Sequence, residues 1–438
     1  MFFPAEALLA FPFSTLHSVF DRLRGCIVTD ATSSQEGDKS ENTSGLSFGH
    51  KLWRSLPAAP RRRFFAWFTA LLAPATPVRF PSHARGIIIA GELGRSSGLG
   101  EGARLLVRSI REAGIPCATW DIDRKCLEGD QVGQSAPLLI HVNAPLLPYV
   151  QLFMPRRLLR NRRIIGYWAW ELPVLPKIWL HANRHVHEIW TPSHFTADAL
   201  RTFRKTVRVV PYPFSAADQK PSSRDRASFG LPSQAVIVLV SFNLASSMIR
   251  KNPLDTIHAF KEAFGNRSDR VLLLKIGHTE NYLKDLSLIR EAVGNASNIR
   301  IETGDFSGPD TLALMKCSDI VLSLHRSEGF GLVVAEAMAL GRCVIATDWS
   351  ATAEFMDETC GFPIPYTLVP AEDPRGVLDI PRTRWALPDI SAASAALRRA
   401  ADDPALRSRL GDAARERVFR KLNSEPLQTA LETIGVEA

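Results

Sequence analysis

The sequence predicts an α/β protein built from two doubly wound parallel-sheet domains that face each other across a cleft. Short apolar runs alternate with helical patterns in both halves of the chain, which is the order of elements in parallel sheets. The length of 438 residues suits two domains of about 150 to 200 residues, each large enough to bury its own core. A polar stretch at 215–228 marks the link between them.

These patterns set the expected domain boundaries. We place an N-terminal extension at 1–82, a first Rossmann-like domain at 83–214, a second at 215–425 and a C-terminal tail at 426–438. Six Cys residues show no paired spacing, so we expect neither a zinc site nor a disulfide framework. Unpaired thiols are typical of a cytoplasmic protein.

The first half opens with a strand at 86–90, and a glycine-dense loop then leads into a helix at 104–113. Loops this rich in glycine approach ligands closely, which makes Gly98 and Gly100 candidates for the cleft. A dinucleotide-binding fingerprint is the obvious alternative, but the glycine spacing does not match it. We therefore disfavour a dehydrogenase.

Asp121 and Asp123 end a short strand and could together hold a divalent ion. The second half of the chain already offers a basic pair for phosphate. We therefore expect a solvated strand end here and no metal.

Two further strands of the first half, 138–145 and 163–173, end in polar or aromatic residues. Trp170 and Glu171 at the end of the second strand suggest a sugar-binding platform, with a ring face for C–H groups and an acid for hydroxyls. His141, at the end of the first, is equally well explained as a histidine satisfied within the core.

The second half repeats the alternation. A buried strand at 236–243 is followed by a loop that carries Arg250 and Lys251, and then by an amphipathic helix at 254–264. Strand, basic loop and helix form one half of a nucleotide-binding βαβ unit. More apolar runs complete the sheet at 271–277, 299–304, 319–325 and 343–347. Residues 390–422 form a long helical pattern.

The most informative stretch is 327–341, which places Glu336 in an otherwise apolar helix. An ionised carboxylate there would cost several kcal/mol without a partner, so something polar must meet it. Gly329 and Gly331 let the backbone approach a bound group, and the free N–H groups of the helix start favour an anion. Glu328 faces the same spot. The sequence predicts a phosphate seat flanked by acids.

Glu328 and Glu336, with Gly-Phe-Gly-Leu after the first acid, resemble the donor site of retaining family 4 glycosyltransferases (glycosyl transferases group 1), which have the GT-B fold. The resemblance covers roughly residues 86 to 425. In that family the loop after the first strand of the second domain carries the cations that neutralise the donor diphosphate, which implies this role for Arg250 and Lys251. Many members have an earlier Arg where this chain has Ser246.

The resemblance implies the remaining site residues as well. Its catalytic group is Glu328, Lys251 and Arg250, and its donor-binding group is Glu336, Gly329, Phe330, Gly331, Leu332, Gly304 and His325. The backbone near Gly304 would hold the nucleobase. The acceptor side of the cleft consists of Gly98, Gly100, Trp170 and Glu171, where members often carry a His in place of the last pair.

The resemblance implies a retaining, metal-independent hexosyltransferase with no cofactor. It would transfer a hexose from a nucleotide diphosphate sugar to a saccharide or a polyprenyl-diphosphate-linked acceptor in cell-surface polysaccharide synthesis. A pair of acids also suggests a hydrolase, but Glu336 lies beside the phosphate seat. A sugar-nucleotide epimerase of the same fold and a non-catalytic, membrane-attached partner subunit stay open as alternatives.

Residues 1–82 lie outside the resemblance. In that region, 61–72 sets a basic cluster against an apolar patch that is too short for the roughly 20 residues of a membrane span. We expect it to lie on the inner face of the cytoplasmic membrane. The net charge of +8 agrees with anionic lipid or with a diphosphate-linked acceptor. No aromatic-basic module supports a nucleic-acid partner.

Overall fold

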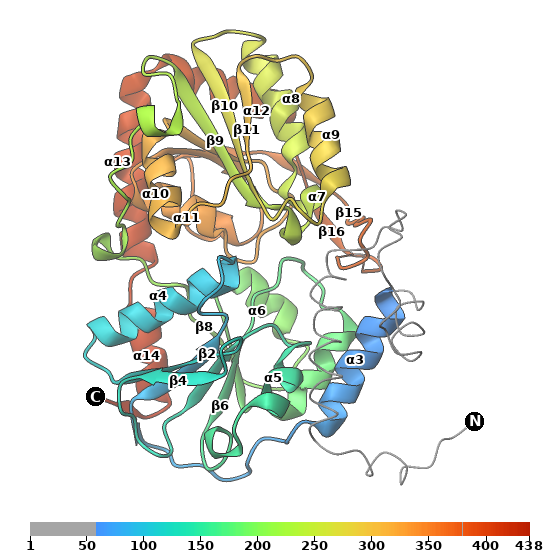
Figure 1. Cartoon of the computed structure of the whole chain (residues 1–438), viewed down its shortest axis with the longest axis vertical. Coiled ribbons are helices and arrows are strands. Elements are labelled where there is room, and N and C mark those ends of the chain that lie inside the picture. The colour runs from blue at the N-terminus through green and yellow to red at the C-terminus, as the bar shows by residue number, and fades with distance from the viewer. Residues whose placement is uncertain (1–57, 379) are drawn as a thin grey trace, which may run out of the picture.

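The structure is a computed structural model that describes residues 58–378 and 380–438. Two lobes, each centred on a parallel sheet, lie one above the other in Figure 1. The first sheet has the strand order β4-β3-β2-β5-β6-β7-β8, and β4 alone runs antiparallel to its neighbour. Its strands are β2 (Ile87–Gly91), β3 (Cys117–Asp121), β4 (Cys126–Gly129), β5 (Leu138–His141), β6 (Ile164–Tyr167), β7 (Glu188–Thr191) and β8 (Val207–Val209).

Helices cover both faces of this sheet. They are α3 (Ala58–Leu72), α4 (Gly98–Glu112), α5 (Leu147–Phe153) and α6 (His194–Leu200), with the 3-10 helices η3 (Arg156–Leu158) and η4 (Lys177–His185). Helix α4 begins six residues before the expected start at 104, because the Ser97 hydroxyl accepts the N–H of Gly100 and caps the helix there. The last six residues of the glycine-dense loop, 98–103, are therefore helical.

The second sheet is entirely parallel, in the order β11-β10-β9-β12-β13-β14. Every apolar run expected in this half forms one of its strands. The strands are β9 (Val236–Asn243), β10 (Arg270–Gly277), β11 (Ile299–Glu302), β12 (Ile320–Ser323), β13 (Cys343–Thr347) and β14 (Phe362–Ile364). A separate hairpin is formed by β15 (Tyr366–Pro370) and β16 (Arg384–Pro388).

The helices of the second lobe are α7 (Met248–Lys251), α8 (Pro253–Phe264), α9 (Leu283–Val293), α10 (Gly308–Cys317), α11 (Leu332–Ala339), α12 (Ile390–Asp402) and α13 (Pro404–Lys421). Short 3-10 turns are η5 (Ala216–Asp218), η6 (Ala227–Phe229), η7 (Leu244–Ser246) and η8 (Ser350–Glu354). The single helix expected over 390–422 is two helices, because Pro404 cannot continue α12 and instead starts α13, with Asp403 as its cap.

The chain returns to the first lobe at its C-terminal end (Figure 1). Residues that we expected to form a tail contain α14 (Glu425–Thr433) and β17 (Val436–Glu437). Strand β17 pairs in parallel with β1 (Ala84–Arg85), at the start of the first lobe. The connection also bonds to the link between lobes, because the N–H of Phe214 donates to the carbonyl of Leu422 at 2.6 Å. Two covalent passages therefore hold the lobes together.

One hydrophobic core spans the two lobes. Tyr212, in the link, packs edge-on against Phe330 of the second lobe, with ring centroids 4.9 Å apart. On its other side Tyr212 lies against α4, where a Cβ at Gly102 would lie 2.3 Å from the tyrosine ring. The glycine at 102 is thus required by packing between helix and link.

We expect Gly102→Ala to destabilise the protein by about 1–3 kcal/mol, the usual cost of overpacking a core. The backbone of α4 and the buried ring of Tyr212 leave no room for the methyl group. Gly308→Ala is the matched control, since a Cβ there meets nothing within 4 Å at the start of α10. Thermal unfolding measures both. Equal melting temperatures for the two variants would contradict this packing constraint.

Candidate active site

Two cations lie side by side at the carboxyl end of β9. Ser247 and Asn252 adopt left-handed backbone conformations, with φ of 71° and 56°, and enclose the single turn of α7. The Ser247 hydroxyl accepts the N–H of Arg250, and the Asn252 amide donates to the carbonyl of Leu324 at 2.9 Å. These bonds fix the turn against the loop after β12. Arg250 and Lys251 consequently face the segment that leads into α11.

Arg250 is almost fully buried, with 3% of its surface exposed. Its guanidinium donates to the carbonyl of Ser327 at 2.8 Å and lies 3.1 Å from a carboxylate oxygen of Glu328. It also reaches across to the first lobe, where the carboxylate of Glu171 lies 3.7 Å away. One arginine therefore joins acids from both lobes.

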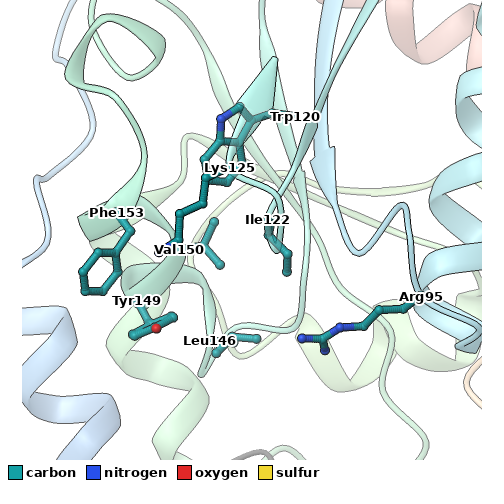
Figure 2. Close-up of a pocket in the computed structure, with 8 residues that line it drawn as sticks. All are labelled: Arg95, Trp120, Ile122, Lys125, Leu146, Tyr149, Val150 and Phe153. Atoms are coloured by element: carbon teal, nitrogen blue, oxygen red, sulfur yellow. The ribbon is translucent and has the colours of Figure 1, made fainter. Parts of the chain in front are cut away.

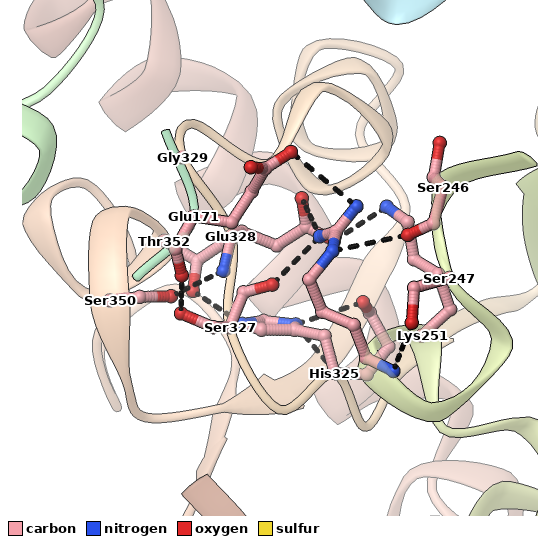
Figure 3. A network of polar contacts seen from close by, with 12 residues as sticks. Glu171, Ser246, Ser247, Lys251, His325, Ser327, Glu328, Gly329, Ser350 and Thr352 are labelled. Carbon is pink, nitrogen blue, oxygen red and sulfur yellow. Dashed lines mark hydrogen bonds and ion pairs between the residues drawn. The ribbon is translucent and has the colours of Figure 1, made fainter. Parts of the chain in front are cut away.

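Lys251 completes the network, with its ammonium 2.5 Å from the second carboxylate oxygen of Glu328 (Figure 3). Burial disfavours ionisation of Glu328, but Lys251 and Arg250 outweigh it and lower the pKa of Glu328 to about 2. Burial also lowers the pKa of Lys251. The backbone N–H of Glu328 donates to the Ser350 hydroxyl at 2.8 Å, which holds the main chain at this position.

This pairing corrects one expectation. The sequence placed Glu328 beside the phosphate seat, and the resemblance implied that Arg250 and Lys251 neutralise the donor diphosphate. Instead Glu328 is buried and forms ion pairs with both cations. The pairs form because buried charges need partners of opposite charge. Any phosphate that binds these cations must compete with Glu328.

The lobes touch directly beside this network. The carbonyl of Gly329 accepts the Ser193 hydroxyl at 2.7 Å, and a Cβ at Gly329 would lie 2.9 Å from the carbonyl oxygen of Trp170. The Ser327 hydroxyl donates to the carbonyl of Glu171. The glycine at 329 therefore allows the second lobe to approach the first closely.

Helix α11 starts immediately after these contacts. Gly331 has a φ of 93°, and a Cβ there would lie 2.3 Å from the Thr352 side chain. Among the described residues no side chain caps the start of the helix, so its first N–H groups have no side-chain partner there. The start of α4 lies opposite, with Gly98 close to the side chain of Leu332. Two helix N-termini thus converge on one region.

Glu336 is half-buried in α11 and faces α4. Burial raises its pKa to about 8, and the nearby carboxylate of Glu101 raises it further, against the opposing effect of Arg108 and Arg104. These two arginines are themselves paired with Glu101. Among the residues that the structure describes, Glu336 makes no side-chain hydrogen bond or ion pair. We expected Glu336 to need a polar partner, and no residue that the structure describes supplies one.

Two expected donor ligands belong to the protein interior. Phe330 is buried among Tyr212, Phe214 and Phe355, so its ring supports the core. His325 is fully buried, and burial lowers its pKa to about 4. Its ring nitrogens lie within hydrogen-bonding distance of Ser323 and Thr352 and of the Trp349 carbonyl. His325 thus ties the end of β12 to the segment 349–352.

The expected aromatic platform is also wrong. Trp170 is 4% exposed, its indole N–H donates to the Val174 carbonyl at 2.9 Å, and its ring packs against Trp179. A run of aromatic residues after a strand is as consistent with a hydrophobic core as with a sugar-binding platform. Here these residues belong to the core. Of Trp170 and Glu171, only Glu171 is partly exposed: 29% of its side chain is accessible beside Arg250.

Gly100 and Gly304 differ from expectation too. A Cβ at Gly100 would collide with the carbonyls of Arg95 and Glu92, so this glycine serves the fold of its own loop. The N–H of Gly304 already donates to Glu302 at 2.6 Å, and its carbonyl accepts from Lys275. Neither backbone group of Gly304 is left for a nucleobase in this arrangement.

Sequence reasoning missed three residues around the site. Lys275 lies at the end of β10 over the ring of Phe306, and a lysine within an apolar strand was the signal that could have found it. Glu354 accepts the N–H groups of His194 and Phe195 and so ties η8 to the first lobe. Asp373 bonds Ser247 at 3.5 Å. No sequence pattern indicated the last two.

The acidic pair at the end of β3 has structural partners. Asp121 accepts the N–H groups of Gly94, Asp123 and Arg124, and Asp123 pairs with Arg95 at 2.7 Å. Within 58–378 and 380–438, no three His, Cys, Asp or Glu side chains are arranged to hold a metal ion. The two aspartates shape the glycine-dense loop.

A separate apolar pocket lies in the first lobe (Figure 2). It is lined by Arg95, Trp120, Ile122, Lys125, Leu146, Tyr149, Val150 and Phe153. None of the expected site residues lines it.

The comparisons with known proteins concern the second lobe and the overall fold. Residues 237–379, which contain the two cations and α11, match the family model of glycosyl transferases group 1. The fold is similar to that of a glycosyltransferase from Rickettsia africae, with 14% identity, a TM-score of 0.59 and coverage of 82% of this chain and 98% of that one. The chain has a GT-B glycosyltransferase fold.

Two further solved structures share the GT-B fold. HepE from Anabaena, in complex with UDP and glucose, is 13% identical with a TM-score of 0.56, over 80% of this chain and 99% of that one. TarM from S. aureus, in complex with fondaparinux, alpha-GlcNAc-glycerol and UDP, is 13% identical with a TM-score of 0.50 over 72% of this chain. This chain spans 61% of the length of TarM. No curated protein matches the chain.

The raised pKa of Glu336 makes stability depend on pH. The folded chain keeps a proton that the unfolded chain loses between pH 4.5 and about 8, so stability falls as the pH rises through this range. We expect Glu336→Gln to be more stable than the natural protein above about pH 8, on the order of 1 kcal/mol. The difference should vanish near pH 4.5.

Thermal unfolding at several pH values measures this difference. Glu291→Gln on α9 is the matched control, because Glu291 is exposed and should show no pH-dependent effect. A constant difference between Glu336→Gln and the natural protein across the range would show that Glu336 is ionised in the fold.

Proposed function

We propose that this protein is a retaining hexosyltransferase that uses a nucleotide diphosphate sugar as donor. The supporting observation is the convergence of Arg250 and Lys251 with the uncapped start of α11 at the gap between two lobes. Two fixed cations and free N–H groups suit a diphosphate. The family match over 237–379 supports glycosyl transfer.

In this proposal the negative charge that grows on the leaving diphosphate is stabilised by Arg250 and Lys251. Preorganised charges in a site that excludes water usually lower the barrier of such a reaction more than any other effect. The two side chains supply the positive charge that a divalent metal supplies in other transferases, so the reaction needs no metal. The departing phosphate and the incoming acceptor would meet on one face of the sugar, which gives retention.

Glu328 has two roles in this mechanism. Before the donor binds, its carboxylate forms ion pairs with Arg250 and Lys251. The donor diphosphate then displaces the carboxylate, because two phosphates carry more negative charge than one carboxylate. The displaced acid then lies beside the reacting sugar and can accept its hydroxyls. Glu336, with a pKa of about 8, is protonated at neutral pH and suits hydrogen bonds to ribose hydroxyls.

The acceptor is proposed to be a saccharide, free or linked to polyprenyl diphosphate, in cell-surface polysaccharide synthesis. HepE was solved with UDP and glucose and TarM with UDP, which makes UDP-sugars the first donors to test. Glu171 is the acid of the first lobe nearest the two cations and would bind acceptor hydroxyls. We place the reaction at the cytoplasmic face of the membrane.

A screen of UDP-, GDP- and ADP-sugars by thermal shift tests the donor site. A donor that binds only the folded chain raises its melting temperature by mass action. We expect Lys251→Ala and Glu336→Ala each to abolish the shift, while Lys284→Ala, at an exposed position of α9, keeps it. Unchanged shifts in both site variants would refute the site assignment.

The competition at Glu328 can be tested separately. Glu328→Gln leaves two buried cations underpaired, so we expect lower stability, by up to about 3–5 kcal/mol, together with tighter UDP binding. Calorimetric titration with UDP measures the affinity. Glu291→Gln, at an exposed position of α9, should bind UDP as the natural protein does. Weaker UDP binding by Glu328→Gln would contradict the competition.

A further inference from the structure

Helix α3 is apolar on both of its faces. Phe65, Ala66 and Thr69 are buried against the first lobe. Phe64, Trp67 and Leu71 lie on the opposite face and Leu72 at the C-terminal end of the helix, and their exposed fractions are 50%, 49%, 55% and 46%. A helix that is hydrophobic all round is normally enclosed by protein or lipid. We call these four residues the outer face of α3.

The outer face is held in place by the contacts of the inner one. Phe65 packs on Tyr149 of α5 with ring centroids 5.4 Å apart. At the end of the helix, Arg184 of η4 donates to the carbonyls of Ala70 and Leu71, and His185 lies 3.1 Å from the former. The helix is docked firmly, so the exposure of the outer face does not come from a loosely attached segment. Figure 1 shows α3 along the outer edge of the first lobe, far from α4.

The surface around α3 is basic. Residues 58–91 and 131–187 contain twelve Lys and Arg but a single acid, Glu171, which belongs to the gap between lobes. Arg156, Arg157 and Arg160 are exposed and follow α5, the helix on which α3 packs. Exposed Leu180 of η4 adds apolar area beside the same helix. Apolar and cationic side chains thus share one side of the first lobe.

We propose that the outer face of α3 binds the surface of an anionic lipid bilayer. Tryptophan and leucine side chains suit the boundary between headgroups and acyl chains, and nearby arginines suit negatively charged headgroups. No helix in the described ranges is long and apolar enough to cross a bilayer, so the contact is with the surface. An acidic protein fits this surface less well, because the four central residues carry no charge.

The biological purpose of this membrane contact rests on the proposed function, and the contact itself does not. A bilayer under α3 would hold the first lobe beside a lipid-linked acceptor, while the gap near α4 stays open to a soluble donor. The membrane contact itself follows from the helix and can fail independently of donor binding.

Co-sedimentation of the full chain with vesicles tests the surface. We expect binding to vesicles of phosphatidylglycerol mixed with phosphatidylcholine, weak binding to phosphatidylcholine alone, and loss at about 1 M salt, where the Debye length is about 3 Å. Trp67→Ser with Leu71→Ser should lower the bound fraction at least about tenfold. Leu283→Ser with Leu288→Ser, exposed at 66% and 46% on α9 of the other lobe, is the matched control and should bind normally.

Three readouts decide the outcome. Normal vesicle binding by the Trp67 and Leu71 variant, or none by the natural protein, overturns the proposal. Sedimentation equilibrium showing a dimer that only this variant disrupts, without vesicle binding, assigns the outer face to a second copy and also overturns it. The donor-induced thermal shift of the same variant should stay unchanged, which separates this test from that of the donor site.

Discussion

The rest of the site depends on the buried ion pairs between Glu328 and the two cations after β9. Removing three charged groups from water is costly, and the cost is recovered only when each group finds well-placed partners. Arg250 has the carbonyls of Ser327 and Ser246 as well as the acid, and the carboxylate of Glu328 has Lys251 and Arg250. Segments 77 residues apart are thereby brought into one cluster. The ion pairs between Glu328 and the two cations thus stabilise the conformations of the loops that carry them.

The same cluster explains why the lobes are in contact. The 327–330 segment that carries Glu328 also presents the carbonyl of Gly329 to Ser193 and the hydroxyl of Ser327 to Glu171. Movement of Glu328 therefore changes the contact between lobes. In the proposed function, ligand binding at the cations would be coupled to separation of the lobes through this one short segment, which gives a physical basis for donor-dependent opening and closing.

The sheets could be predicted because buried parallel strands are nearly continuous apolar runs, as at 236–243 and 271–277. The basic pair and the glycine-flanked helix start were also found, since each is a local pattern. The break at Pro404 had a local signal, and the expectation of one long helix wrongly ignored it.

The partners of the site residues could not be predicted. The sequence placed Glu328 beside the phosphate seat, but its pairing with Lys251, 77 positions earlier, depends on tertiary structure. Trp170 and Phe330 illustrate the same limit, because an aromatic ring at a strand end or before a helix suits a ligand or a core equally well. Only packing against Trp179 and Tyr212 decides between them. The interlobe acid Glu354 carries no sequence signal at all.

A crystal structure of the protein with UDP bound tests the central claim most directly. We predict that the diphosphate lies within hydrogen-bonding distance of Arg250 and Lys251, capped by the first N–H groups of α11, and that Glu328 has left both cations. A complex in which UDP binds elsewhere, or binds while Glu328 keeps both ion pairs, would contradict this claim.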